Sequence, residues 1–229
     1  SATKGSDIII ITAGLARKPG MSRDDLLSAN AEIVGKAATE TLKYSPDAFY
    51  IVLTNPLDTM AYLTMKKTGL PRNRVIGQAG ILDSARMRAF EAMETGVSVE
   101  NINCYVLGGH GDEMVPLTRH SNIAGIPLRD YLPADKLEAI VNRTRKGGGE
   151  IVNLLKTGSA YYAPSAACAQ MAEAILKNKN LIVPCAAHME GEYGLSDMFF
   201  GVPVMLGANG IEKVVEYDLD EAEKAMFEK

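Results

Sequence analysis

Residues 7–14 read DIIIITAG and place four consecutive isoleucines between Asp7 and Thr12. β-Branched side chains favour extended backbone, and an unbroken apolar run of this length is typical of a parallel strand covered on both faces. Ala13 and Gly14 end the run. The stretch therefore predicts a buried parallel strand, which needs helices to cover the sheet.

Helical and strand patterns alternate after this run. Ser22 and Asp25 form a capping box that predicts a helix start, and Gly69 followed by Pro71 is a helix stop signal. The predicted elements are a helix over 22–44, a strand over 49–53, a helix over 58–69 and a strand over 74–76. This β-α-β-α-β series predicts a Rossmann-type doubly wound parallel sheet, which binds ligands at the carboxyl ends of its strands.

The pattern changes after Gln78. The predicted elements are helices over 83–94, 133–145, 149–156 and 164–177, strands over 101–107, 181–186, 202–206 and 213–217, and a polar helical start over 218–229. Segregated helices and antiparallel strands are typical of an α+β domain. The fold class is therefore α/β, with part of a dinucleotide-binding domain in residues 1–79 and an α+β substrate domain in 80–229. The run Gly147-Gly148-Gly149 is interpreted as a helix junction.

The composition excludes several classes of protein. Of the 229 residues 47% are apolar and 23% are charged, which excludes disordered and collagen-like chains. The 24 Lys and Arg against 28 Asp and Glu leave a net charge of -4, so we expect no nucleic-acid partner. Since no apolar run approaches the roughly 20 residues of a membrane-spanning helix, we also expect no membrane partner.

Cysteine usage indicates the compartment. Cys104, Cys168 and Cys185 are far apart in the chain and show no spacing typical of metal ligands. We interpret them as reduced core residues of a cytoplasmic protein and expect no metal site.

Two polar stretches follow predicted strands. The loop over 16–23 holds Arg17, Lys18 and Arg23 around a Pro-Gly pair, and arginine suits two-point recognition of a carboxylate. Taken alone, this loop is better explained as a solvated basic loop. Asn55 follows the second strand, where its amide could bind a ligand or form an Asn-Pro turn that opens a helix.

A third stretch pairs Asp83 and Arg86 with the glycine-flanked His110. Asp83 could instead cap a helix, and Arg86 could lie on the surface. His110 is harder to explain structurally, because neighbouring glycines give backbone freedom and open space that a core histidine rarely needs. These three residues are therefore candidates for acid–base chemistry.

The combination of motifs resembles the lactate/malate dehydrogenase family, from Asp7 to the end of the chain. The motifs that carry the resemblance are residues 12–23, TAGLARKPGMSR, residues 54–56, TNP, residues 82–86, LDSAR, and residues 109–112, GHGD. Within the family the chain is similar to the malate-specific bacterial group. The resemblance implies reversible hydride transfer between NAD(H) and malate or oxaloacetate, as in the tricarboxylic acid cycle.

The resemblance also implies roles for individual residues. His110 would exchange a proton with the substrate, and Asp83 would orient its ring. Arg23 would close over the site and polarise the carbonyl. Substrate binding would fall to Arg17, Arg23, Asn55 and Arg86, and cofactor binding to Asn30, Leu53, Thr54 and Asn55.

Arg17 would select the substrate, because lactate enzymes of the family commonly carry a neutral glutamine at that loop position. A buried second carboxylate without a cation is strongly unfavourable, and so is an unpaired arginine facing a methyl group. We therefore expect a small dicarboxylate substrate. A lactate dehydrogenase, or a dehydrogenase of another 2-hydroxy acid, is the alternative.

The chain also departs from the family. It has no G-x-G-x-x-G after its first strand and no acidic residue about 20 positions further on, which together grip the dinucleotide. Its first strand resembles the fourth strand of the family sheet. We therefore expect this chain to be part of a longer enzyme, inactive by itself, and attach the function to that parent. The alternative to an enzyme is a non-catalytic scaffold fragment. The resemblance also implies a homo-oligomer, either a dimer or a tetramer.

Overall fold

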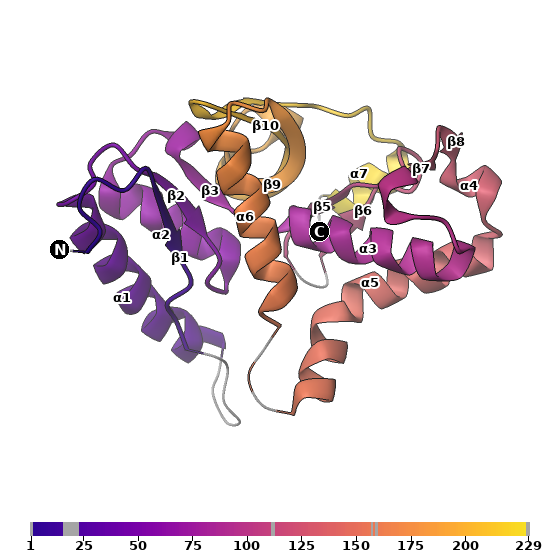
Figure 1. Cartoon of the computed structure of the whole chain (residues 1–229), viewed down its shortest axis with the longest axis horizontal. Coiled ribbons are helices and arrows are strands. Elements are labelled where there is room, and N and C mark those ends of the chain that lie inside the picture. The colour runs from indigo at the N-terminus through magenta and orange to yellow at the C-terminus, as the bar shows by residue number, and fades with distance from the viewer. Residues whose placement is uncertain (1, 16–22, 111–112, 157, 159, 228–229) are drawn as a thin grey trace.

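The computed structural model describes residues 2–15, 23–110, 113–156, 158 and 160–227, with the side chain of Arg23 left out. Its main sheet contains six strands in the order β1-β2-β3-β9-β10-β11. Figure 1 shows the N-terminal part with α1 and α2 on one side, α3 and α5 on the other, and the long strands β9 and β10 between them.

The N-terminal part forms the predicted parallel series. Its elements are β1 (Ile8–Ile11), α1 (Arg23–Leu42), β2 (Phe49–Val52), α2 (Leu57–Thr68), the 3₁₀ turn η1 (Arg72–Arg74) and β3 (Val75–Gly77). β1 pairs in parallel with β2, and β2 with β3. Helix α2 ends at Gly69, whose φ of 68° is left-handed, so the predicted stop signal is confirmed.

Strand β1 is covered on one face only. Ile9 and Ile11 are buried with residues of α1 and α2, but Ile10 is 43% exposed. In the described chain β1 pairs with β2 alone, so it is an edge strand. On the opposite face, Ile51 and Ile76 of the next two strands belong to the apolar cluster that includes residues of α3 and α6, whereas Ile10 does not. The prediction that this strand is buried on both faces is therefore wrong.

The second part contributes antiparallel strands to the same sheet. Its elements are α3 (Gly80–Thr95), η2 (Val99–Asn101), β4 (Ile102–Asn103), β5 (Val106–Gly108), β6 (Met114–Pro116), β7 (Asn122–Ile123), β8 (Ile126–Pro127), α4 (Leu128–Tyr131), α5 (Ala134–Leu155), α6 (Tyr162–Leu176), β9 (Leu181–Glu190), η3 (Glu192–Gly194), β10 (Ser196–Gly207), β11 (Gly210–Val214) and α7 (Glu221–Phe227). Gly77 of β3 pairs with Ala186 of β9, so one sheet connects both parts of the chain.

Two regions of the second part are divided differently from the prediction, and the strands expected over 202–206 and 213–217 are β10 (Ser196–Gly207) and β11 (Gly210–Val214). The single strand expected over 101–107 is two short strands, β4 and β5, which belong to different sheets. The two helices expected over 133–145 and 149–156 are one helix, α5, which continues through the three glycines. Ile140, Thr144 and Gly147 form its buried stripe, and α5 packs against α3. This packing maintains the helix despite a glycine cost of about 1 kcal/mol per residue.

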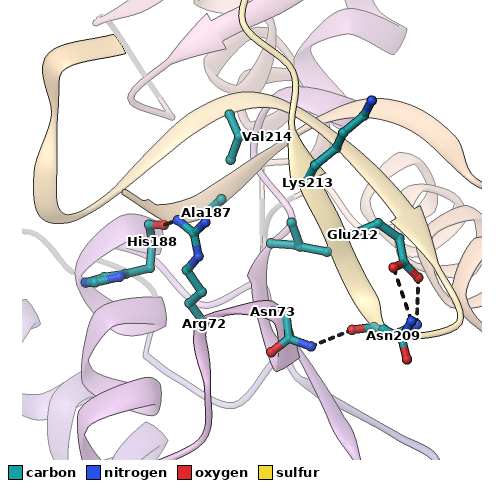
Figure 2. A pocket seen from close by; sticks show the side chains of 9 residues that line it. Arg72, Asn73, Ala187, His188, Asn209, Glu212, Lys213 and Val214 are labelled. Atoms are coloured by element: carbon teal, nitrogen blue, oxygen red, sulfur yellow. Dashed lines mark hydrogen bonds between the residues drawn. The ribbon is translucent and has the colours of Figure 1, made fainter. Parts of the chain in front are cut away.

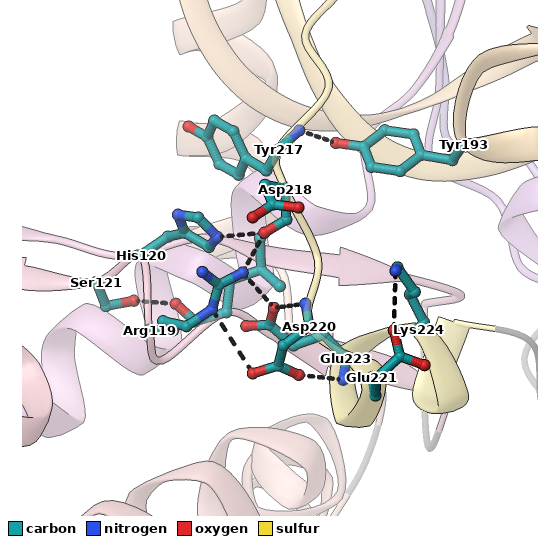
Figure 3. A network of polar contacts seen from close by, with 11 residues as sticks. Arg119, His120, Ser121, Tyr193, Tyr217, Asp218, Asp220, Glu221, Glu223 and Lys224 are labelled. Atoms are coloured by element: carbon teal, nitrogen blue, oxygen red, sulfur yellow. Dashed lines mark hydrogen bonds and ion pairs between the residues drawn. The ribbon is translucent and has the colours of Figure 1, made fainter.

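A polar network attaches the C-terminal helix to the turn after β6 (Figure 3). Arg119 donates to Glu223 at 3.0 Å and also to the backbone carbonyl of Asp218. The Glu223 carboxylate accepts from the backbone N–H of Asp220, whose own carboxylate accepts from the N–H of Glu223, both at 2.9 Å. This is a capping box at the start of α7, and Phe227 of this helix belongs to the apolar cluster that includes residues of β9 and β10.

The cysteines are buried and free, as predicted. Burial raises the pKa of the Cys168 thiol to about 11, so the thiol is protonated near neutral pH. In the described part of the chain, no helix is long and apolar enough to cross a membrane.

Glu91 on α3 is a buried carboxyl group without a counter-ion in contact. Its side chain is fully buried, and neither carboxyl oxygen finds a hydrogen-bond partner within the described residues. Burial raises the pKa of Glu91 to about 8, although the charge of Arg88 opposes this. The native state therefore binds a proton that the unfolded chain releases near its ordinary value of 4.5.

We expect Glu91→Gln to stabilise the protein at alkaline pH. Between about pH 4.5 and pH 8 the unfolded state of the parent is ionised and the native state is neutral, so stability falls as the pH rises. The variant lacks this slope and gains about 4 kcal/mol of unfolding free energy at pH 8, with little gain near pH 4.5. Urea unfolding across this range measures it. Glu94→Gln, on the exposed face of α3, is the control, and equal pH slopes in the parent and Glu91→Gln would contradict the expectation.

Candidate functional site

The predicted acid–base residues meet at the carboxyl end of β3. Asp83 lies in the first turn of α3, which begins three residues after β3, and Arg86 lies one turn further along. His110 follows β5 by two residues. Helix α3 packs against β5, so the helix start and the strand end converge here.

A single carboxylate connects the other two side chains. One oxygen of Asp83, Oδ2, lies 2.8 Å from Nδ1 of His110, and the other, Oδ1, accepts from Nη1 of Arg86 at 3.0 Å. The Asp83 side chain is 2% exposed, against 17% for His110. Because an ionised carboxylate only accepts hydrogen bonds, Nδ1 carries a proton, and Nε2 is the nitrogen that can exchange one.

The electrostatics favour a protonated ring. Burial opposes the charge on His110, but the hydrogen bond to Asp83 and the negative charge of Asp83 outweigh it, so the pKa of His110 is raised above 6.5. A raised pKa with one nitrogen held by a carboxylate is suited to giving a proton to a carbonyl oxygen and taking it back.

Arg86 supplies the charge for an anionic group. Its side chain is 13% exposed. Nη1 is used by Asp83, while Nε is buried and has no hydrogen-bond partner among the described residues. A guanidinium with unused donors beside an acid–base histidine can hold a carboxylate by two parallel hydrogen bonds.

Close backbone packing maintains this arrangement. A Cβ on Gly80, at the start of α3, would lie 2.4 Å from the carbonyl oxygen of Val106, and one on Gly201 of β10 would lie 2.2 Å from that of Gly108. No side chain fits at either position. The strand that carries His110 is therefore fixed by backbone contacts on two sides.

Asp58 is a second carboxylate at His110 that sequence reasoning left without a role. It lies in the first turn of α2, and the backbone N–H of His110 interacts with it by hydrogen bonding. Burial raises the pKa of Asp58 to about 6, while the charge of His110 opposes this and that of Glu113 adds to it. The available signal was its place just after Asn55 at the carboxyl end of a strand, where a parallel sheet gathers its ligand-binding residues.

Hydrogen bonds between side chains and backbone hold the ends of β1 and β2 side by side. Asn30 accepts from the N–H of Leu15 at 2.7 Å and donates to the carbonyl of Asn55 at 2.7 Å. Thr54 donates to the carbonyl of Ala13 at 2.7 Å. Asn30 is 1% exposed, so its amide joins the two loops, and the exposed side chain of Asn55 lies at the sheet edge.

Two predicted arginines cannot be placed. Arg17 lies outside the described residues, and Arg23 begins α1 but its side chain is not described. The other predicted residues all have described side chains at the carboxyl ends of β1, β2, β3 or β5. These are Asn30, Leu53, Thr54, Asn55, Asp83, Arg86 and His110.

A hollow of about 330 Å³ lies elsewhere and is separate from this site (Figure 2). Arg72 and His188, which line it, are at the amino end of β3, because β3 and β9 run antiparallel. Arg72 is paired with Glu192 at 2.8 Å and with Glu190 at 3.3 Å. Its charge is already neutralised, so this hollow offers no equivalent of Arg86. No cluster of three or more potential metal ligands occurs in the described part of the chain.

A carboxylate-held histidine and an arginine lie at the carboxyl edge of the sheet, where doubly wound folds bind dinucleotides and other ligands. The family models that match the chain give the class, the NAD-binding oxidoreductases. The family model described as "lactate/malate dehydrogenase, NAD binding domain" matches residues 1–77. The model described as "lactate/malate dehydrogenase, alpha/beta C-terminal domain" matches residues 81–229. The chain belongs to the lactate/malate dehydrogenase family.

Individual relatives agree with this assignment. A malate dehydrogenase of Roseiflexus sp. is 58% identical over 229 residues, which are 100% of this chain and 74% of that protein. One from Halalkalibacterium halodurans is 60% identical over 227 residues, or 99% of this chain and 72% of that protein.

Solved structures show the same fold. The malate dehydrogenase of Picrophilus torridus matches with a TM-score of 0.95 at 50% identity, covering 99% of this chain and 72% of that one. A Cryptosporidium parvum lactate dehydrogenase, complexed with lactic acid and nicotinamide adenine dinucleotide, matches with a TM-score of 0.94 at 42% identity, covering 99% and 73%.

Proposed function

We propose that this protein is a malate dehydrogenase that transfers a hydride reversibly between NAD(H) and malate or oxaloacetate. The observation that carries the proposal is the Asp83 carboxylate, which holds His110 at 2.8 Å and Arg86 at 3.0 Å. It sets an acid–base group and a carboxylate-binding group side by side, as reduction of a 2-oxo acid requires.

Each residue of the site has a proposed role in the reaction. Arg86 binds the C1 carboxylate of the substrate, and Nε2 of His110 gives its proton to the carbonyl oxygen of oxaloacetate. Asp83 holds the ring and stabilises its charged form. In the oxidation of malate, neutral His110 accepts the hydroxyl proton. When bound, NAD supplies the hydride acceptor, and the protein has only to place the substrate beside it.

The edge formed by β1 and β2 is the proposed contact surface for the cofactor. A Cβ on Gly14 would lie 2.5 Å from Cγ2 of Thr54, so a bare backbone passes close to this strand end. We propose that the Leu53–Asn55 segment contacts the nicotinamide side. Asn30 is buried and hydrogen-bonded to the backbone of Leu15 and Asn55, so its proposed role is to hold these two loops together. The loop backbone that Asn30 positions, and not its own side chain, is then proposed to contact the cofactor.

Arg17 is proposed to bind the second carboxylate of the substrate, and Arg23 to polarise the carbonyl. The relatives named malate dehydrogenase, at 57–60% identity, support the dicarboxylate over lactate. The test is to mix the purified protein with NADH and to compare the loss of NADH absorbance with oxaloacetate and with pyruvate. Faster turnover of pyruvate than of oxaloacetate would refute the proposal.

We further propose that the protein acts in the cytoplasm, in the tricarboxylic acid cycle, as a homo-oligomer. Free buried cysteines agree with a reducing compartment. Exposed apolar side chains around the end of α5 and along α6, among them Leu154, Tyr162 and Leu176, offer surface for a second copy. Light scattering of the eluted protein measures the number of copies.

Removing the charge of Asp58 is expected to shift the pH dependence. The negative charge of Asp58 supports protonation of His110, so Asp58→Asn lowers the pKa of the ring. Oxaloacetate reduction needs protonated His110 and should be lost at lower pH than in the parent, with kcat/KM about 3- to 10-fold lower on the alkaline side. Malate oxidation should shift in the same direction, gaining at acidic pH.

The pH profile of kcat/KM in both directions measures this shift. Asp47→Asn removes a carboxylate that lies in the turn before β2, away from His110, and is the control for net charge. A profile of Asp58→Asn that coincides with that of the parent would show that Asp58 does not act on His110.

A further inference from the structure

The three glycines inside α5 have no conformational explanation. The helix runs without interruption from Ala134 to Leu155, and Gly147, Gly148 and Gly149 are absent from the residues with positive φ. Any residue can adopt this backbone, and glycine destabilises a helix interior relative to alanine. A reason for glycine must therefore come from the space around the helix.

Space is limited at one position of the run. A Cβ on Gly147 would lie 3.2 Å from Cδ and 3.7 Å from Nε of Arg86, and 3.9 Å from Cε2 of Phe90. A Cβ on Gly148 would lie 3.8 Å from both Nη atoms of Arg86, an ordinary contact. A Cβ on Gly149 would meet nothing within 4 Å. The restriction is thus greatest at Gly147 and ends within two residues.

The neighbour that would be displaced belongs to the site. Arg86 is held at its tip by Asp83, through Nη1 at 3.0 Å, and its stem lies against the bare backbone at Gly147. Nε is buried beside the same stretch of α5 and has no partner among the described residues. A shift of the stem by a few tenths of an ångström would turn the plane of the guanidinium.

We propose that Gly147 is a positioning residue for Arg86. The missing side chain lets the arginine stem lie directly on α5, and the contact with the helix and the bond to Asp83 together fix the plane of the guanidinium. This inference rests on the proposed function, in which Arg86 binds the C1 carboxylate. Gly147 itself touches Arg86 and not the reacting atoms.

The test compares Gly147→Ala with Gly149→Ala, which is the same change two residues away. A carboxylate contact acts equally on bound substrate and transition state, so its loss raises KM and leaves kcat nearly unchanged. We expect Gly147→Ala to raise KM for oxaloacetate about 10-fold with kcat within twofold, and to leave the affinity for NADH unchanged. Gly149→Ala should match the parent in both constants.

Gly148→Ala gives a second reading if Gly147→Ala does not fold. Its Cβ makes only ordinary contact with the guanidinium, so KM should rise about two- to threefold. Equal effects at all three glycines, a KM for Gly147→Ala within twofold of the parent, or a fall in kcat alone would overturn the proposal.

A stability measurement separates this proposal from the proposed function. Alanine is the better helix former, so Gly149→Ala should raise Tm by about 2–4 °C, whereas crowding against Arg86 should cancel that gain in Gly147→Ala. If the unsubstituted enzyme turns over pyruvate faster than oxaloacetate, the proposed function is wrong. If Gly147→Ala gains as much Tm as Gly149→Ala, the packing of Arg86 on Gly147 is wrong, whatever the activity.

Discussion

Replacing His110 by asparagine should lower kcat/KM for oxaloacetate reduction by about 10³-fold, since positioned acid–base groups contribute roughly 10² to 10⁴. Asparagine can still occupy the space beside Asp83, but it cannot carry a proton to the carbonyl oxygen. The affinity for NADH should not change, because the cofactor does not depend on this proton. Steady-state rates of NADH oxidation and fluorescence titration of NADH measure the two quantities.

His120→Asn is the matched control for this experiment. His120 lies on the far side of β6, where Nε2 bonds the carbonyl of Asp218 at 3.0 Å and the ring stacks on Tyr217. Its kcat/KM should stay within about twofold of the parent. Equal losses in the two variants would mean that stability, not proton transfer, explains the effect.

Asp83→Asn tests the origin of the raised pKa of His110. The amide keeps the shape of the carboxylate but not its charge, which is a main support of the protonated ring. The pKa of His110 should fall, so reduction of oxaloacetate is lost at lower pH than in the parent. An unchanged profile would show that another group sets the charge of His110.

Arg17→Gln should reverse the preference between oxaloacetate and pyruvate. The ratio of the two kcat/KM values is expected to fall by about 10³-fold, because an unpaired buried carboxylate costs several kcal/mol and a glutamine accommodates a methyl group. The same assay with both substrates gives the ratio directly. The change should come from a loss with oxaloacetate together with a gain with pyruvate.

Lys18→Gln is the control for Arg17→Gln, since it removes one positive charge from the same loop. If general attraction of anions explained the preference, both variants would reduce it similarly. If Arg17→Gln leaves the ratio unchanged, the dicarboxylate preference does not depend on Arg17.

The N-terminal part of the fold was predictable because its signals are local. The isoleucine run, the Asn-Pro pair and Gly69 each act within a few residues, and β1, β2, β3 and α2 lie within one or two residues of the expected bounds. The continuity of α5 was not predictable, because packing against α3 overrides the glycine signal.

The site was partly predictable for a similar reason. Asp83, Arg86 and His110 were recognisable from their types and spacing, and the structure brings all three together. Asp58 carries no motif of its own, and its effect on His110 arises from tertiary contact. The buried bonds of Asn30 to the loop backbone likewise have no sequence signature.

The bare backbones around the site also determine how it can vary. Gly80 and Gly201 approach the carbonyl oxygens of Val106 and Gly108 too closely for any side chain. In a library of single substitutions, intolerant positions would therefore extend well beyond the residues that touch substrate and would include sites with no side chain to contribute. Substitutions at these supporting positions would impair the protein as strongly as substitutions at the residues that touch substrate.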